Sequence, residues 1–286
     1  MKNKLKIHKT PAETVLYCIV FVVFCVFAFS YVYMLFWCVY SGMRSADEVA
    51  ANPFGFSAIR LGNYIDVFRE MNANGADFMT LLGNSLYFSL LGAGLNILVT
   101  SMFAYVVAKY KFFGSRFIYM LVIVVITLPI FGSGSAMYRL LYKLKFLNSR
   151  LMILTSLGGF SMNFLYMHAF YSSMSWSYAE AAEIDGANDW QIYFRVMFPQ
   201  SVTMAGSLFV LLWMTEWNSY GSALIYLPKM PTLAVGIYQF RTQMMYDSKM
   251  NILYAACAIS LLPPLILFVS CNNALMSNVS LGGIKE

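Results

Sequence analysis

The sequence predicts an all-α, polytopic membrane protein with six transmembrane helices and a helical loop on the cytoplasmic side. Hydrophobic residues make up 60% of the 286 positions and charged residues only 11%, whereas a soluble domain carries about 25% charged residues. The apolar runs are also continuous, and a helix needs about 20 such residues to cross a bilayer. A transmembrane β-barrel would instead show short alternating segments. These observations exclude a soluble enzyme and a disordered chain.

Six stretches free of Asp, Glu, Lys and Arg are long enough to cross the membrane. They lie within Thr14–Met43, Phe78–Ala108, Phe117–Tyr138, Leu151–Ala179, Val196–Thr215 and Met250–Ile284. An even number of spans places both termini on one side. Four lysines precede the first span, which favours a cytoplasmic N-terminus. The first apolar run is too long for the core of a signal peptide, so we expect it to remain as a helix.

The spans predict the organisation of the chain. It comprises a basic cytoplasmic N-terminus (1–13), a first transmembrane helix (14–43), an extracytoplasmic loop (44–77), a core of five transmembrane helices (78–276) and a cytoplasmic tail (277–286). Within the outer loop, Tyr64–Met71 has the pattern of a short amphipathic helix. The net charge of +6 is spread over loops and the leader, so we expect no nucleic-acid partner. The five cysteines lie in apolar runs without a C-x-x-C pair, which predicts neither disulfides nor a metal site.

The loop 177–199, between the fourth and fifth spans, carries helix signals. Ser177 followed by Glu180 has the spacing of a capping box, so a helix should begin there. The alanines that follow favour a slim helix. Gly186 can adopt the left-handed conformation that ends a helix. A slim helix of this kind fits a cleft on another protein, although a plain connector between two spans would carry the same signals.

A second helix signal follows within the same loop. Asn188 and Gln191 have the spacing of another N-terminal cap. Large apolar and polar residues then alternate around the helix surface, which predicts a helix lying along the membrane face. Pro199 stands where the fifth span should start, a position that tolerates proline.

At these residues the sequence resembles the integral membrane subunits of bacterial binding-protein-dependent ABC importers, in the carbohydrate group. The loop of that family reads E-A-A, three residues, G, nine residues, I-x-L-P. Matching positions are Glu180, Ala181, Ala182, Gly186 and Pro199, with Val196 and Phe198 replacing Ile and Leu. Asp185 belongs to the closer sugar-permease form of the stretch, while Glu183 stands where a basic residue is common.

Further ordered matches extend the resemblance from about residue 81 to the end of the chain. Asn84-Ser85-Leu86 opens the second span as in the family. Trp217-Asn218 is similar to the first half of the family's W-N-E-F, but Ser219 replaces the acid. The tail 281–286 resembles the G-x-[VI]-K-G ending.

The resemblance implies a non-catalytic permease subunit in the bacterial plasma or inner membrane that imports a carbohydrate, most simply an oligosaccharide. Implied partners are an ABC ATPase dimer that binds ATP-Mg, a second homologous permease and an extracytoplasmic solute-binding protein. The chain itself contains no P-loop motif and needs no cofactor of its own. The cytoplasmic coupling-helix loop would dock on the ATPase. The implied coupling residues are Glu180, Ala181, Ala182, Asp185, Gly186 and Pro199.

The end of the fifth span supplies candidate residues of a substrate pathway. An acid within a span is costly and usually faces a cavity or a partner, and Glu216 is such an acid. Trp213, Trp217 and Tyr220 share its helix face by spacing, and Asn218 adds an amide. Aromatic, amide and carboxylate groups suit sugar rings. The alternative is an aromatic belt at the membrane surface.

The sequence argues against two other functions. A self-contained secondary transporter of a small polar solute would carry ion-coupling charges and often inverted repeats, but only Glu216 qualifies and no repeat is visible. A membrane-embedded enzyme would need a constellation such as H-E-x-x-H or G-x-S-x-G, which does not occur. His168 is expected to be an interior histidine rather than a ligand.

Prolines predict breaks in two spans. Pro129, followed by Gly132-Ser-Gly134, favours a break in the third span, and Pro263-Pro264 favours a kink in the sixth. Broken helices inside a membrane often line a pathway.

Overall fold

The computed structural model describes residues 10–110, 112–128, 132–247 and 249–279. Residues 1–9 of the expected leader, residues 280–286 of the expected tail and Pro129 therefore lie outside the described residues. The chain divides into two compact units. One comprises Met1–Val67 with Met244–Ile259, and the other comprises Phe68–Gln243 with Ser260–Glu286.

The first unit is built on two apolar helices. Helix α1 spans Pro11–Gly42 and α13 spans Met250–Ser260, with the short helix α2 at Ala46–Ala51. The side chains of α1 are exposed over most of its length, as expected for a helix in lipid. Its C-terminal end packs on α13. A Cβ added at Gly42 would lie 2.8 Å from the backbone nitrogen of Ala255, so only glycine permits this approach.

A buried arginine organises the loop that follows α1. Arg44 is only 2% exposed. Its guanidinium donates to the carbonyl oxygens of Glu48, Asn52 and Pro53 at 2.8–3.1 Å, and to Ser57 Oγ at 2.9 Å. The five N–H donors of a guanidinium suit several acceptors in one plane. Loop 45–57 is therefore folded around one side chain.

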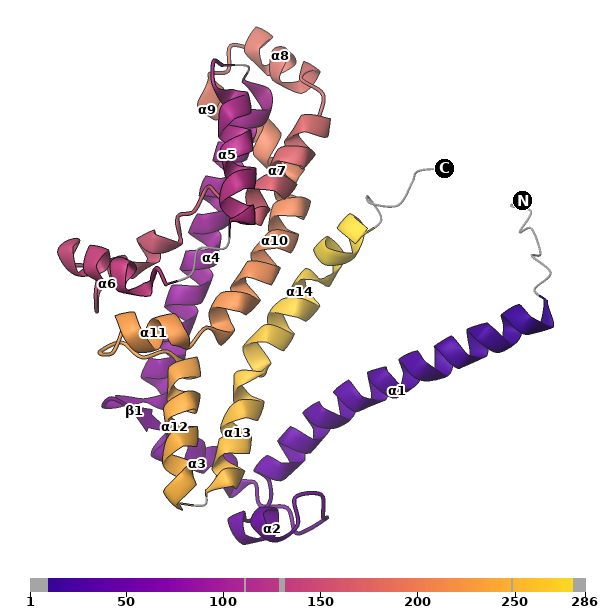
Figure 1. Ribbon diagram of the computed structural model, residues 1–286, viewed down its shortest axis with the longest axis vertical. Helices are drawn as coiled ribbons and strands as arrows, with labels where there is room; N and C mark the ends of the chain where they lie inside the picture. The colour runs from indigo at the N-terminus through magenta and orange to yellow at the C-terminus, as the bar shows by residue number, and fades with distance from the viewer. Residues whose placement is uncertain (1–9, 111, 129–131, 248, 280–286) are drawn as a thin grey trace. The chain divides into compact units, whose positions relative to one another are not determined.

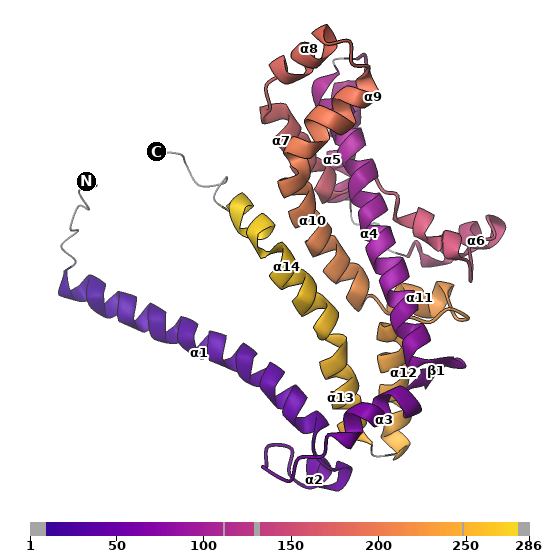
Figure 2. The same cartoon turned by 180° about the vertical axis from the view of Figure 1, so that it is seen from behind.

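The second unit is a helical bundle. Helices α4, α7 and α10 pack against one another, and α14 packs on α10 (Figures 1 and 2). The bounds are β1 Asn72–Ala73, β2 Ala76–Asp77, α4 Phe78–Lys109, α5 Ser115–Thr127, α6 Gly134–Lys143, η1 Arg150–Ser156, α7 Met162–Ser173, α8 Ser177–Ile184, α9 Asp189–Gln191, η2 Ile192–Met197, α10 Phe198–Asn218, α11 Gly221–Tyr226 and α14 Leu262–Val279. Helices α3 (Gly62–Glu70) and α12 (Leu233–Asp247) connect the two units along the chain. Helix α3 matches the amphipathic helix expected at Tyr64–Met71.

A small hairpin departs from the all-α expectation. Strands β1 and β2 pair antiparallel, with Asn72 opposite Asp77 and Ala73 opposite Ala76. Asn74 and Gly75 both have positive φ, 52° and 84°, as the tight Asn-Gly turn requires. The fold is therefore mostly rather than wholly helical.

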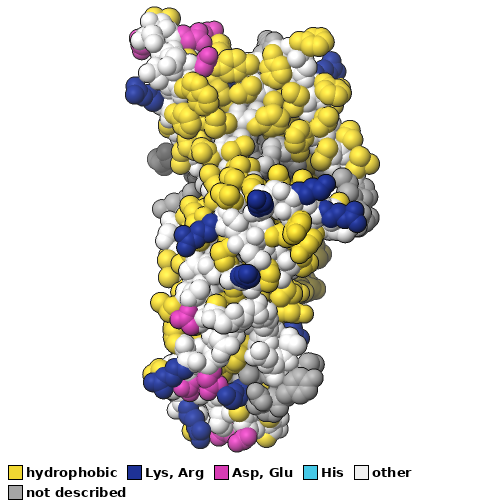
Figure 3. All heavy atoms as spheres, turned by 90° about the vertical axis from the view of Figure 1, so that its left-hand side faces the viewer, with side chains coloured by type: hydrophobic (Ala, Val, Ile, Leu, Met, Phe, Trp, Pro, Cys, Tyr) yellow, Lys and Arg dark blue, Asp and Glu magenta, His cyan; other side chains and the backbone are white. Residues whose placement is uncertain are grey.

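Four helical segments of the described chain are long and apolar enough to cross a membrane. They are Pro11–Gly42, Phe78–Lys109, Asp189–Asn218 and Met250–Cys271. Apolar side chains also cover much of the upper part of the face in Figure 3. The third expected span is interrupted, because α5 ends at Thr127 and α6 begins only at Gly134. In the sixth expected span a single turn residue, Leu261, separates α13 from α14, just before the prolines for which a kink was predicted.

Candidate functional site

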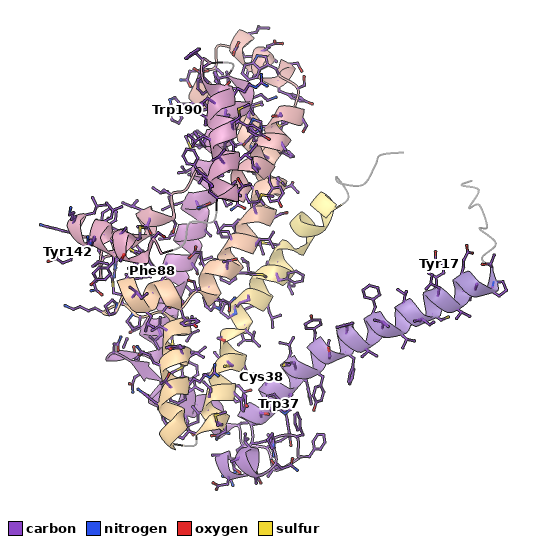
Figure 4. The ribbon with its side chains drawn as sticks, viewed as in Figure 1. Tyr17, Trp37, Cys38, Phe88, Tyr142 and Trp190 are labelled. Carbon is purple, nitrogen blue, oxygen red and sulfur yellow. The ribbon has the colours of Figure 1, made fainter. Side chains whose placement is uncertain are left out.

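Helix α8 presents a small, exposed surface at one end of the bundle (Figure 1). Ala179 is fully buried in the apolar cluster formed by α4, α7 and α10. Glu180 and Ala181 face outward, and Ile184 is 87% exposed. A bulky apolar side chain with so large an exposed fraction, at the end of a helix, is suited to contact a partner protein. Trp190 lies near the same end and is also exposed (Figure 4).

The capping box expected at the start of α8 is not formed. Trp176 is the N-cap, and its carbonyl oxygen accepts from the N–H groups of Ala179 and Glu180. The Ser177 hydroxyl instead lies 2.7 Å from Ser175 Oγ. The prediction was wrong because the helix starts one residue early and makes Ser177 its first residue. The Glu180 carboxylate thus remains exposed, and no hydrogen bond within the described chain engages it.

Gly186 ends α8 as predicted. Its φ is +82°. The N–H of Ala187 donates to the carbonyl of Ala182, and the N–H of Gly186 donates to that of Glu183, both at 2.9 Å. This is the hydrogen-bond pattern of a Schellman motif. Asp185 is the exposed C-cap residue just before the glycine.

The second half of the loop confirms one expectation and corrects another. Asn188 and Gln191 form a reciprocal capping box. The separate interfacial helix and the fresh start at Pro199 are wrong, because Asp189–Asn218 runs as one helix. The π-helical segment η2 precedes the proline, and the N–H of Phe198 reaches back to the carbonyl of Tyr193. A π turn adjusts the hydrogen bonding ahead of a residue that cannot donate.

Two polar contacts involve the C-terminal end of α4, one with the loop and the other with the end of α7. Tyr110 follows α4, and its hydroxyl donates to Asp189 Oδ1 at 2.7 Å. Burial and this hydrogen bond raise the pKa of Tyr110 well above its usual range, so the hydroxyl remains a donor. Lys109 Nζ donates to the carbonyl of Met174 at 2.5 Å, close to the C-terminal end of α7.

A buried chain of hydroxyls lies within the same bundle. Tyr193 of η2 donates to Ser101 Oγ of α4 at 3.0 Å. Ser101 is 2.7 Å from the hydroxyl of Tyr171 on α7, which is 2.8 Å from Ser201 Oγ on α10. All four residues are at most 3% exposed. Hydrogen bonds between helices are a main source of specificity where packing is apolar. The chain therefore ties the π segment to three helices.

A cavity of about 260 Å³ lies in the second unit near the other end of helix Asp189–Asn218. Its walls come from α4, α6, η1, α10, α11 and the segment before α12, with Phe88 (Figure 4) on α4. The lining residues are Ser85, Phe88, Ser89, Met137, Met152, Ile153, Thr155, Ser156, Glu216, Ser219, Ser222, Ala223, Tyr226, Leu227 and Thr232. The lining is thus rich in hydroxyls, with Glu216 as its one charged group among the described residues.

The structure separates the five candidate pathway residues. Glu216 is half-buried and lines the cavity. Trp213 and Trp217 are buried, with ring centroids 5.3 Å apart. The exposed Asn218 donates to the carbonyl of Met214. Tyr220 stacks on Tyr238 at 4.7 Å. Of the five, only Glu216 is among the residues that line this cavity.

The shared helix face fails at Tyr220 because α10 ends at Asn218. The sequence reasoning also missed the serines and threonines of the cavity and the tyrosines of the hydroxyl chain. Polar residues inside apolar spans were a visible signal. Which of these polar residues hydrogen-bond to each other could not be predicted, because the partners lie up to 92 positions apart in the sequence. His168 packs against Tyr119 at 4.6 Å, which fits an interior position.

The architecture is that of a polytopic helical membrane subunit with an exposed loop at one end of its bundle. Residues 96–280 match the family model described as the binding-protein-dependent transport system inner membrane component. The chain belongs to this family.

Relatives match along nearly the whole chain. The arabinooligosaccharides transport system permease protein AraQ of Halalkalibacterium halodurans is 25% identical over 92% of this chain and 94% of its own. The diacetylchitobiose uptake system permease protein NgcG of Streptomyces coelicolor is 26% identical over 88% and 83%. A chain of a bacterial ABC transporter involved in the import of the acidic polysaccharide alginate superposes with a TM-score of 0.77 at 20% identity, over 93% of this chain and 98% of that one.

Family membership confirms the sequence interpretation of a non-catalytic permease subunit of a binding-protein-dependent importer, in place of a self-contained secondary transporter. Such a subunit is a multi-pass inner membrane protein that works with a binding protein and a separate ATPase.

Proposed function

We propose that this chain is one of two permease subunits of an ATP-driven oligosaccharide importer and that residues 177–199 couple it to the ATPase. The coupling assignment is supported by the exposed surface of α8, which ends at the Gly186 turn. Glu180, Ala181, Ala182 and Asp185 would meet a groove of an ABC ATPase dimer that binds ATP-Mg. Pro199 would contribute indirectly, through the π turn that keeps the loop and α10 in one helix.

The proposed topology keeps six spans. The four long apolar segments account for four of them. Helix α5 and helix α7, with η1 before it, would supply the third and fourth. The N-terminus (1–13), the coupling loop and the tail (277–286) would be cytoplasmic, and residues 44–77 would be extracytoplasmic. The core would be 78–276, next to a first helix at 14–43.

The cargo is proposed from the relatives and the cavity together. Permeases for arabinooligosaccharides, diacetylchitobiose and galactooligosaccharides are among the similar proteins. A cavity lined by hydroxyls and a carboxylate, with Phe88 and Tyr226 among its apolar walls, suits a sugar ring. An extracytoplasmic solute-binding protein would deliver the oligosaccharide. Glu216 would lie on the pathway. Trp213 and Trp217 would support its helix, and Asn218 and Tyr220 would form the end of that segment.

Charge reversal at the coupling helix tests this function. In cells that express the whole transporter, Glu180→Lys should remove the ATPase from the affinity-purified complex and abolish uptake. The chain itself should still insert in the membrane. Glu13→Lys makes the same charge reversal at the start of α1 and should retain the ATPase. Normal uptake by Glu180→Lys would contradict the coupling assignment.

A further inference from the structure

The cavity beside Glu216 has a chemical bias that its volume alone does not reveal. In the described part of the chain its lining includes a carboxylate, seven serine and threonine hydroxyls and a tyrosine, but neither lysine, arginine nor histidine. The carboxylate of Glu216 makes no hydrogen bond or ion pair with any described residue. The carboxylate oxygens of Glu216 are therefore available to accept hydrogen bonds from a ligand in the cavity.

Two of the hydroxyls around the cavity reinforce this bias. The donors of Ser89 and Thr155 are used by backbone carbonyls at 2.6 and 2.7 Å, so these two oxygens face a guest mainly as acceptors. By contrast, Ser85 Oγ accepts from the N–H of Leu233 at 2.7 Å, so its own hydrogen can be donated to a guest. Thr232 is 7% exposed, and its Oγ1 has no hydrogen-bond partner among the described residues. A buried hydroxyl without a partner is costly unless a guest or water satisfies it.

Resting on the proposed function, we propose that this cavity binds one uncharged sugar ring of the transported oligosaccharide and that Glu216 excludes sugar acids. A neutral sugar brings many O–H donors to an acceptor-rich wall. A sugar acid brings a second carboxylate, with no cation among the described lining residues to compensate it, and burying an unpaired like charge is strongly unfavourable. At about 260 Å³ the cavity lies just below the size of typical ligand sites and suits a single ring.

Thiol modification tests the charge bias without knowledge of the natural cargo. The assay uses the whole transporter with the five native cysteines replaced by alanine and with Ser222→Cys, since Ser222 lines the cavity and is exposed. The probes are a cationic trimethylammonium-ethyl and an anionic sulfonatoethyl methanethiosulfonate. Their rate ratio, divided by that for free 2-mercaptoethanol, should be about fivefold in favour of the cation. Adding Glu216→Gln should bring it close to one, whereas Glu13→Gln, which removes a charge at the start of α1, should leave it unchanged.

Protection by sugars tests the ligand class. At equal concentration, at least one of arabinotriose, galactotriose and cellotriose should slow modification by threefold or more, and trigalacturonate should not. The assignment is overturned if Glu216→Gln leaves the ratio unchanged, if only trigalacturonate protects, if no neutral sugar protects, or if the introduced cysteine does not react. Oligosaccharide uptake by the cysteine-free transporter is measured in parallel. Its persistence would show that the failure concerns the cavity and not the importer function.

Discussion

The hydroxyl of Tyr193 donates a hydrogen bond of 3.0 Å to Ser101 Oγ and so joins the π-helical segment to α4. Tyr193 lies five residues after Asn188, which caps the same helix at the coupling loop. That helix is 30 residues long, or roughly 45 Å, and Glu216 at the cavity lies near its other end. The loop and the cavity are therefore opposite ends of one continuous element.

The buried hydroxyl chain should contribute measurably to stability. Tyr193→Phe removes one hydrogen bond and should cost about 1 kcal/mol. In a double-mutant cycle, Tyr193→Phe and Ser101→Ala should together cost less than the sum of their separate effects, because they remove the same contact. Denaturant unfolding of the purified complex measures both. Tyr142→Phe on α6, where the side chain is 70% exposed, is the matched control. Additive effects would contradict the contact.

The turn after α8 should require glycine for its backbone conformation alone. No atom of the described residues lies within 4 Å of a Cβ built at Gly186, so the cost of a side chain comes from φ = +82°. Gly186→Val should therefore strain the turn by about 1 to 2 kcal/mol and abolish uptake while the chain still inserts. Gly186→Asn should retain partial uptake, since asparagine tolerates this region. Gly221→Ala, at an open position without positive φ, is the control. Full uptake by Gly186→Val would refute the requirement.

The N-terminal cap of α4 should make stability depend on acid pH. Asp77 accepts hydrogen bonds from the hydroxyl and the backbone N–H of Thr80, which lower the pKa of its carboxyl. Its stabilising effect is complete above the unfolded pKa of about 4 and is lost as the pH falls through the lower folded pKa. Asp77→Asn keeps the cap without the charge. The difference in Tm between wild type and Asp77→Asn should therefore shrink between pH 5 and pH 3 (roughly the range in which a carboxyl titrates). A constant difference over this range would argue against the ionised cap.

Arg44 should hold loop 45–57 in place. Lysine retains the charge but lacks the fork of donors that reaches three carbonyls and Ser57. Arg44→Lys should weaken the loop by about 3 kcal/mol. Hydrogen exchange should accelerate over residues 45–57 and not in α4. Arg69→Lys, at an exposed site on α3, should leave exchange unchanged. Equal protection in Arg44→Lys and wild type would show that the arginine is not the organising group.

Composition and local pattern determined much of this protein. Long uncharged runs predicted the apolar helices, because the length of a span follows from bilayer thickness. The positive φ of Gly186 and the Asn188 cap followed from their own residues and nearest neighbours. The family motif of the loop could also be identified from the sequence, because all of its positions fall within 20 residues.

The tertiary structure alone decided features that the local sequence pattern left open. Ser177 failed as a cap because Trp176 took that position, and Pro199 did not start a helix because a π turn accommodated it. The pairing of Tyr193 with Ser101 joins separate helices. The cavity is enclosed by walls from six segments, of which Glu216 was the only residue foreseen. Local patterns set which backbone conformations are available, but packing between segments distant in sequence selects among them and brings the site together.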